Sequence, residues 1–237
     1  MELNFLGRGS AFNSKEGNTS AYFIENKELF LIDCGEAVFE RIIKNDVVKD
    51  IEQINVLITH THSDHIGSLG SLIMYSYYIM KEKVNIIIPT NAKYIENIEM
   101  LLKAVGCTND MYNYVVEDSF DNKYDIFSNI RFIETRHSDN LNCYGIVFAT
   151  ENGIIYYSGD TNDIDVIRSI LKKNYKIDKL YIETTLLNYE GNVHLYIGFL
   201  DEVINEELKK QVYCMHVESD ECIKRVRELG FNVVDIK

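Results

Sequence analysis

Three histidines and an aspartate fall within six residues in the first half of the chain, as His60, His62, Asp64 and His65. Imidazole and carboxylate groups are ligands that a borderline divalent ion such as zinc binds in proteins. His60 and His62 are two residues apart on a segment expected to be extended, so their side chains should project to the same side. Asp64 and His65 come after the chain turns, so they cannot easily share that pair's ion. The spacing therefore suggests two metal ions side by side.

Two simpler explanations fit this segment less well. A polar loop that holds histidines by chance would rarely combine three imidazoles and a carboxylate at this density. A single structural zinc would favour pairs of cysteines at short spacing. The five cysteines of the chain include no CxxC pair, so a structural zinc site is not favoured.

Candidate ligands recur at the ends of predicted strands further along the chain. Polar groups gathered along one edge of the sheets can form one coherent site. All six histidines of the chain fall in segments proposed for the site. The residues at strand ends are His60, His137, Asp160 and His216.

If two ions are bound, the candidate ligands divide into two sets with a carboxylate shared between them. Asp160 can bridge both ions because a carboxylate has two oxygens. Between two divalent cations about 3.5–4 Å apart, the pKa of a shared water falls towards about 7, and the hydroxide can attack a carbonyl or phosphoryl group. Zinc is the first expectation for both ions, with manganese and iron as alternatives. The first ligand set is His60, His62 and His137, and the second is Asp64, His65 and His216.

A further acidic residue and a further histidine follow in the second half of the chain. Glu183 lies near the end of a strand predicted over 180–184, and His194 opens a helix predicted to reach about Lys210. Such a pair can protonate a leaving oxygen as a general acid, with the carboxylate fixing the imidazole. The alternatives are a solvated strand end for Glu183 and a helix cap for His194. Together with Asp64, which is also a ligand, these two residues form the predicted catalytic set.

Charge and cysteine content narrow the classes of function. With 37 acidic and 24 basic residues, the formal net charge is −13, which opposes broad contact with nucleic acid or an anionic membrane. It does not oppose phosphate at a metal site, because divalent cations bring local positive charge. The cysteines indicate reduced thiols in a cytoplasmic protein, and Cys143 and Cys214 are interpreted as core residues. The N-terminus has no signal-peptide pattern, and the apolar-leaning stretch 69–80 is too short to span a bilayer.

Apolar periodicity and turn residues predict two successive halves, each with several strands followed by strand–helix units. This order suggests an α+β fold with two sheets and helices outside them, in one domain over residues 1–237. The strands are predicted over 3–7, 20–25, 29–34, 54–58, 85–88, 112–117, 130–136, 143–149, 154–157, 180–184, 212–215 and 231–236. The helices are predicted over 37–45, 66–81, 91–105, 163–173, 194–210 and 219–230, with a polar loop over 119–125.

The motif His60-Thr61-His62-Ser63-Asp64-His65 resembles the HxHxDH signature of the metallo-β-lactamase fold superfamily. His137, the segment 158–161 and His216 match the later metal motifs of that superfamily in order, so the resemblance covers essentially the whole chain. It implies a four-layer αββα sandwich of two mixed sheets flanked by helices, with a dinuclear, usually zinc, site at the edge between the sheets. Asp160 at the bridging position is similar to the phosphodiesterase and glyoxalase branches, whereas the β-lactamases proper have cysteine there.

Within the superfamily, the chain is most similar to ribonuclease Z and its short relatives. The segments 5–10, 18–20 and 32–36 resemble that branch near its N-terminus, and Glu183-Thr184-Thr185 with the later His194 resembles its proton-transfer residues. The resemblance also implies a homodimer. However, the chain has no room for the long Gly/Pro-rich arm with which that branch grips tRNA. With a net charge of −13, this departure disfavours tRNA as the substrate.

Three functions are consistent with these residues. The first is a phosphodiesterase that cleaves a small nucleotide, such as a cyclic nucleotide, or a short nucleic acid by attack of a metal-bound hydroxide. The second is a hydrolase of a carboxylic ester, a thioester or a lactone at the same metal site. The third is a non-catalytic sensor or binding module, which the retention of every candidate ligand argues against.

Overall fold

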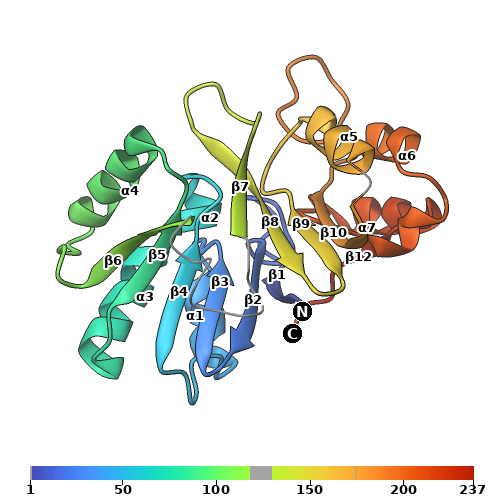
Figure 1. The fold of residues 1–237 in the computed structure, drawn as a ribbon. Coiled ribbons are helices and arrows are strands. Elements are labelled where there is room, and N and C mark those ends of the chain that lie inside the picture. The colour runs from blue at the N-terminus through green and yellow to red at the C-terminus, as the bar shows by residue number, and fades with distance from the viewer. Residues whose placement is uncertain (1, 118–129, 174) are drawn as a thin grey trace. The chain divides into compact units, whose positions relative to one another are not determined.

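The computed structural model describes residues 2–117, 130–173 and 175–237. The chain divides into two compact units (Figure 1). Unit 1 consists of Met1–Ser119 and Asp235–Lys237, and unit 2 consists of Phe120–Val234. The loop predicted over 119–125 lies outside the described residues, and the single domain over 1–237 stays a prediction.

Unit 1 is built around a mixed six-stranded sheet with the strands in chain order. The first two pairings are antiparallel and the last three are parallel. The strands are β1 (Asn4–Gly7), β2 (Ser20–Glu25), β3 (Glu28–Ile32), β4 (Gln53–Leu57), β5 (Val84–Ile88) and β6 (Tyr112–Val116). The helices are α1 (Val38–Lys44), α2 (Ser63–Ile66), α3 (Leu69–Tyr75), the π-helical turn η1 (Ser76–Met80) and α4 (Ala92–Ala104).

Unit 2 contains a second mixed six-stranded sheet, again with the strands in chain order. Its first two pairings are antiparallel and its last three are parallel. The strands are β7 (Ile130–Thr135), β8 (Cys143–Thr150), β9 (Gly153–Tyr157), β10 (Ile177–Glu183), β11 (Val212–Met215) and β12 (Asn232–Val233). The helices are α5 (Ile164–Lys172), α6 (Ile197–Val203), the 3-10 turn η3 (Leu208–Gln211) and α7 (Asp220–Glu228).

The two units therefore repeat one topology, with a hairpin-connected antiparallel half followed by parallel strands and crossover helices. Parallel pairing requires such crossovers, because the chain must return to the same end of the sheet. The predicted α+β class, with two mixed sheets flanked by helices, is confirmed. The predicted hairpins and strand–helix units fall in the expected order.

The hydrophobic core of each unit contains strands whose sequences are nearly continuous runs of apolar residues. The side chains of Ile54, Val56 and Leu57 in β4 have no exposed surface, as expected for a parallel strand covered on both faces. Leu180 and Ile182 in β10 are equally buried and belong to the core cluster of unit 2. Burial on both faces thus fixes the positions of the parallel strands in each unit. It also fixes the positions of the residues at the ends of these strands.

The helix predicted over 66–81 is wrong in its start and its continuity. Helix formation begins at Ser63, and α2 and α3 are separate elements. Between them, the Ser68 side chain donates a hydrogen bond to the Gly35 carbonyl at 2.5 Å and accepts one from the Phe39 amide at 3.1 Å. These contacts hold Ser68 at φ −108°, outside the helical region.

The helix predicted over 194–210 is also wrong, because its first residues are extended. Thr185 pairs with Tyr196 in an isolated parallel bridge, and its amide donates to the Leu195 carbonyl at 2.9 Å. Within this range only Ile197–Val203 is α-helical, Ile204 returns to an extended conformation, and the 3-10 turn η3 begins at Leu208. A contact with a segment that precedes it in the chain therefore overrides the local helical pattern.

In the part of the chain that the structure describes, no helix combines the length and the apolar character needed to cross a membrane.

Candidate metal centre

The four residues of the first motif lie at the junction of β4 and α2 in unit 1. His60 follows the strand, and His62 is the extended residue that precedes α2, at φ −66° and ψ 151°. Asp64 and His65 lie inside α2. The chain thus turns between the two pairs, as the spacing predicts.

The rings of His60 and His62 converge on one another. Nε2 of His60 lies 3.0 Å from Nδ1 of His62, and Nδ1 of His60 lies 3.1 Å from the Thr59 hydroxyl. Two ring nitrogens bound to the same tetrahedral zinc would be roughly 3.3 Å apart, given zinc–nitrogen distances near 2.0–2.1 Å. The pair is therefore arranged as two ligands of one ion would be.

The second pair of the motif is held by a residue from another strand. His65 Nδ1 lies 2.8 Å from Oδ2 of Asp33, and His65 Nε2 lies 3.3 Å from Oδ2 of Asp64. A carboxylate that accepts from Nδ1 fixes the proton on that nitrogen, so Nε2 carries the lone pair that a metal needs. Asp64 and His65 thus direct two donor atoms of suitable type to one place.

Asp33 is a residue whose role the sequence reasoning missed. It follows β3, has a left-handed φ of 61° and is fully buried. Its carboxylate accepts hydrogen bonds from the Thr59 amide and the Thr59 hydroxyl, both at 2.8 Å, as well as from His65. Burial raises the pKa of Asp33, and the hydrogen bonds and charge of its partners oppose that rise. The available signal was an acid directly after a buried strand.

Gly35 gives a first testable prediction, because α2 packs directly on it. A Cβ added at Gly35 would lie 1.9 Å from the carbonyl oxygen of Asp64, a backbone atom that cannot move alone. We expect Gly35→Ala to lower the free energy of unfolding by about 1–3 kcal/mol and to reduce metal binding, because it displaces the start of α2. Chemical denaturation and elemental analysis would measure the two effects.

A matched glycine variant separates this clash from general effects of substitution. Gly191 has a φ of 83°, and a Cβ there would meet nothing within 4 Å. Gly191→Ala should therefore cost only the strain of a left-handed alanine, about 1 kcal/mol, with metal content unchanged. Equal metal loss in both variants would contradict the argument.

In unit 2, the predicted residues gather at the carboxyl ends of the strands. His137 follows β7, Asp160 follows β9, Glu183 ends β10 and His216 follows β11 at a left-handed φ of 56°. His194 lies in the loop between β10 and α6. The five residues come from five segments of the chain, and the sheet of unit 2 brings them together.

Asp160 lies at the centre of the unit 2 cluster. Its Oδ2 is 3.2 Å from Nε2 of His216, 3.7 Å from Nε2 of His137 and 4.0 Å from Nδ1 of His194. The side chain is only 3% exposed. A buried carboxylate among three imidazoles is a donor set that suits a divalent cation.

His137 is oriented by a backbone contact. Its Nδ1 lies 3.0 Å from the carbonyl oxygen of Val193 and donates to it. The proton is thereby fixed on Nδ1, and Nε2 faces Asp160. This second contact of the ring is the kind that orients ligating histidines.

Glu183 and His194 form a hydrogen-bonded pair within the same cluster. Nδ1 of His194 lies 2.8 Å from Oε2 of Glu183, whose other oxygen accepts from the Thr161 amide. Glu183 has no exposed surface, so it is not a solvated strand end. The residue that precedes α6 is Tyr196, so His194 is not a helix cap.

The charge environment of His194 favours its protonated form. Burial lowers the pKa of the ring, but the charge and hydrogen bond of Glu183 and the charge of Asp160 outweigh that effect, so the pKa is raised above its ordinary value. His137, Glu183 and His194 also offer donor atoms that all lie within 4.8 Å of one another. His194 can therefore act as a proton donor or, in another state, as a ligand.

The cysteines near the clusters are part of the core, as predicted. All five cysteines are buried and none is in a disulfide. Burial raises the pKa of the Cys34 and Cys214 thiols to about 12. A thiol with so high a pKa is a poor ligand and a poor nucleophile near neutral pH.

Comparison with known proteins relates most of the chain to one protein family. Residues 1–232 match the sequence model of the family described as Anti-Pycsar protein Apyc1. The Anti-Pycsar protein Apyc1 of Bacillus phage 010DV004 is 27% identical over 236 residues, which cover 91% of this chain and 88% of the phage protein. The ribonuclease Z of Lactococcus lactis subsp. lactis is 37% identical over 91 residues, which cover 36% of this chain and 29% of that protein.

Solved structures show the same fold at lower identity. The metallo-β-lactamase fold protein YhfI from Bacillus subtilis has a TM-score of 0.71 at 17% identity, with 99% of this chain and 95% of that chain covered. A diphosphatase from the PhnP family has a TM-score of 0.73 at 17% identity, with 99% and 94% covered. The short form of human tRNase Z has a TM-score of 0.68 at 19% identity, with 100% and 97% covered. The metallo-β-lactamase fold and the similarity to ribonuclease Z, both predicted from the motifs, are confirmed.

Proposed function

Because this chain belongs to the Anti-Pycsar protein Apyc1 family, we propose that it is a metal-dependent phosphodiesterase whose substrate is a cyclic nucleotide. Proteins similar to this chain include a ribonuclease Z, a tRNase Z and a diphosphatase, which supports phosphate chemistry, and membership of the family favours a small cyclic substrate. The net charge of −13 supports the same choice, because it repels a polyanion but has a small effect on a ligand that carries one phosphate.

The observation that carries the proposal is the pair of donor clusters, one in each unit. In unit 1, the ring nitrogens of His60 and His62 converge to 3.0 Å, and His65 Nε2 lies 3.3 Å from Asp64. In unit 2, Asp160 lies among three imidazoles. The residues fit divalent metal ions, because every donor atom is an imidazole nitrogen or a carboxylate oxygen and the hydrogen bonds of the other ring nitrogens set suitable tautomers.

We propose the ligand sets that the sequence suggests, with Asp160 shared between two ions. Two bound divalent ions would supply an activated water and positive charge at the phosphoryl oxygens. Zinc is the proposed ion, and the cytoplasmic location and the homodimer stay predictions. The proposed ligands are His60, His62, Asp64, His65, His137, Asp160 and His216.

The residues of the chain itself have three tasks in this proposal. Asp33 keeps the proton of His65 on Nδ1 and so keeps Nε2 available. Glu183 holds His194 through Nδ1, which leaves Nε2 as the atom that delivers a proton to the leaving ribose oxygen. The raised pKa of His194 makes the ring a competent acid near neutral pH.

A substrate panel on purified protein tests this function. Elemental analysis should find about two equivalents of metal per chain, and removal of the metal by a chelator should abolish turnover. Cyclic nucleotides should be converted to nucleoside monophosphates, followed by phosphorus NMR, while carboxylic esters, thioesters and lactones remain intact. Turnover of a lactone or thioester without any phosphodiester would overturn the proposal in favour of the second function. A metal-loaded protein inert to the whole panel would favour a binding module.

The role of His194 gives a second prediction. His194→Ala should lower kcat by about 10²–10⁴-fold, the usual contribution of a positioned general acid. Its metal content should equal that of the unsubstituted protein, because His194 lies outside the proposed ligand sets. Kinetics and elemental analysis on the same sample would show whether kcat falls while the metal content stays constant.

A leaving-group series sharpens this test. A phosphodiester with a p-nitrophenolate leaving group needs little protonation, so His194→Ala should affect its hydrolysis much less than that of a cyclic nucleotide. Loss of one equivalent of metal from His194→Ala would instead make His194 a ligand, as its position near His137 and Glu183 would allow.

A further inference from the structure

Unit 2 contains a pocket of about 500 Å³ beside His194. It is formed by the loop between β10 and α6, by α6 itself, and by residues that follow β7 and β9. In Figure 1 this loop is drawn in orange near α5 and α6. His194 belongs both to the pocket wall and to the donor cluster, so a ligand in the pocket would lie next to the proposed proton donor.

Three aromatic side chains line the pocket, and two of them are unusually exposed. Tyr189 is 59% exposed and Phe199 is 45% exposed. The ring of Tyr196 meets that of Phe199 edge-on, with centroids 5.5 Å apart and an interplanar angle of 90°. This contact helps to fix the orientation of Phe199, whose ring keeps exposed surface for another partner. Exposed aromatic faces in a pocket are typical stacking surfaces for planar ligands.

The loop that carries Tyr189 is held in shape by one asparagine of its own and by one that follows β9. The Asn192 side chain donates to the Leu187 carbonyl at 2.7 Å, and the Asn162 side chain donates to the Asn192 carbonyl at 2.8 Å. By contrast, the Asn188 side chain makes no hydrogen bond to any residue that the structure describes. Its amide can therefore both donate to and accept from a ligand in the pocket.

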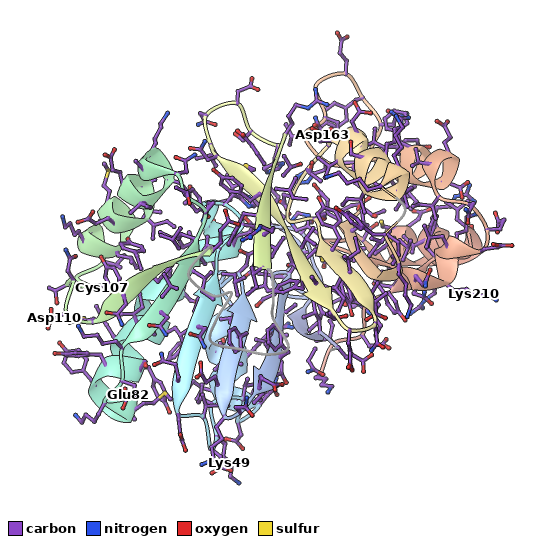
Figure 2. All side chains as sticks on the ribbon, in the orientation of Figure 1. Lys49, Glu82, Cys107, Asp110, Asp163 and Lys210 are labelled. Atoms are coloured by element: carbon purple, nitrogen blue, oxygen red, sulfur yellow. The ribbon has the colours of Figure 1, made fainter. Side chains whose placement is uncertain are left out.

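A cation borders the pocket but is already engaged. Arg136 binds Asp163, which is labelled in Figure 2, through two hydrogen bonds of 2.9 and 3.0 Å. This bidentate pair neutralises the guanidinium. The Glu190 carboxylate also lines the pocket and would repel a second phosphate, whereas the aromatic and amide groups suit an uncharged, planar ring with polar edges.

We propose that this pocket binds the nucleobase of the substrate, stacked on Tyr189 and Phe199 with the Asn188 amide at its edge. The identity of the ligand rests on the proposed function, because the phosphate of a nucleotide must lie at the donor cluster while its base occupies this wall. The base pocket then determines affinity, and the donor cluster determines the chemistry.

Binding measurements test the pocket without any turnover. Isothermal titration calorimetry compares adenosine 5′-monophosphate with ribose 5-phosphate, which lacks only the base. The unsubstituted protein should bind the nucleotide at least tenfold more tightly, and Tyr189→Ala and Phe199→Ala should each reduce that preference about fivefold or more. Tyr189→Phe keeps the ring face and should retain the preference. Tyr175→Ala removes a tyrosine that is 51% exposed and lies outside the pocket wall, so it serves as the control.

Kinetics distinguish a failure of this inference from a failure of the proposed function. For a cyclic nucleotide, Tyr189→Ala should raise KM with little change in kcat, whereas a base-free cyclic phosphodiester such as glycerol 1,2-cyclic phosphate should show no change. If the protein hydrolyses phosphodiesters but both alanine variants keep the preference for the base, the pocket assignment is overturned and the proposed function stands. If no phosphodiester is cleaved but the variants lose the preference, the pocket stands and the proposed function fails.

Discussion

Asparagine in place of Asp33 should lower the amount of metal bound to the protein while leaving its fold intact. The Asp33 carboxylate accepts from the Thr59 amide through Oδ1 and from the Thr59 hydroxyl and His65 Nδ1 through Oδ2. An asparagine must keep its oxygen toward the Thr59 amide. In the reverse orientation its NH2 group would face the Thr59 N–H, and two donors would point at one another. With the oxygen toward the Thr59 amide, the amide nitrogen of the asparagine faces His65.

The consequence for His65 is a change of tautomer. Facing a donor, Nδ1 must act as an acceptor, so the proton moves to Nε2. Nε2 is the nitrogen proposed as the metal ligand, and a protonated nitrogen cannot bind a cation. Loss of a contact that orients a ligating histidine typically costs 10–100-fold in metal affinity. Elemental analysis of Asp33→Asn should therefore show metal falling from about two equivalents towards one.

Asp33→Ala should have a different effect, because it removes all three hydrogen bonds. Leaving buried donors without acceptors costs about 1–3 kcal/mol for each group, so we expect a loss of about 3–5 kcal/mol in the free energy of unfolding. Denaturation of metal-free protein would measure it. Asp33→Asn, with most of its contacts retained, should lose about 1 kcal/mol on the same measurement.

The chain provides a matched control for both substitutions. Asp50 has the same φ of 61° as Asp33 but is exposed. Asp50→Ala therefore reports the cost of a left-handed alanine alone, about 1 kcal/mol, and Asp50→Asn should change neither stability nor metal content. An Asp33→Asn protein with its full complement of metal would contradict the tautomer argument.

The same contacts explain why the donor residues could be predicted from the sequence and Asp33 could not. The first motif is local, so residue type and spacing alone suggest His60, His62, Asp64 and His65 as ligands. The position of Asp33 beside Thr59 depends on the parallel pairing of β3 with β4, which aligns Ile32 with Leu57. No local pattern states which strands pair, so a contact across that pairing becomes visible only in the fold.

The region around His194 illustrates the same limit. Its pairing with Glu183 is predicted from the types and positions of the two residues and matches the family resemblance, and the structure brings the two side chains to 2.8 Å. Its predicted helix is wrong because Thr185 holds the following residues extended. The pocket beside it depends on the shape of the same loop, which is fixed by the Asn162 and Asn192 amides. Side-chain chemistry was readable from the sequence, whereas backbone conformation set by distant partners was not.

The order of strands and helices in the two halves is predicted from the sequence, but the pairing of the strands within each sheet is not. Both sheets have the strands in chain order and change from antiparallel to parallel after the third strand. Topology depends on burial and on crossover connections, which many different sequences satisfy. The donor residues differ between the units, with the first motif on one turn of unit 1 and single residues on separate strand ends in unit 2. The two units thus share one sheet topology, but they place their metal-donor residues in different ways.

Asp160→Asn should have the largest effect on catalysis. The variant keeps the shape of the side chain but removes its charge and one acceptor oxygen, so it is a much weaker ligand for two cations. Stabilisation by metal charge is worth several kcal/mol, and each 1.36 kcal/mol is a factor of ten in rate. We therefore expect kcat/KM for a cyclic nucleotide to fall by about 10³-fold or more, with metal falling to about one equivalent or less.

Asp165→Asn is the matched control for this variant. Asp165 lies in the same unit, is 67% exposed and pairs with Arg168, so its amide should leave both rate and metal unchanged. A decrease of less than tenfold in Asp160→Asn would rule out the bridging role, because a neutral amide cannot replace the charge of a carboxylate shared by two cations.

The three site variants have distinct signatures only if the proposed roles are correct. His194→Ala should lose rate and keep metal, since its ring is held by Glu183 and is not a proposed ligand. Asp33→Asn should lose metal because the proton of His65 moves to Nε2, although His65 itself is unchanged. Asp160→Asn should lose rate and metal together. A purely structural role for these residues would instead couple every loss to a loss of folding stability. Measuring stability in metal-free protein removes that coupling, so the metal and rate data then report the chemistry of each side chain.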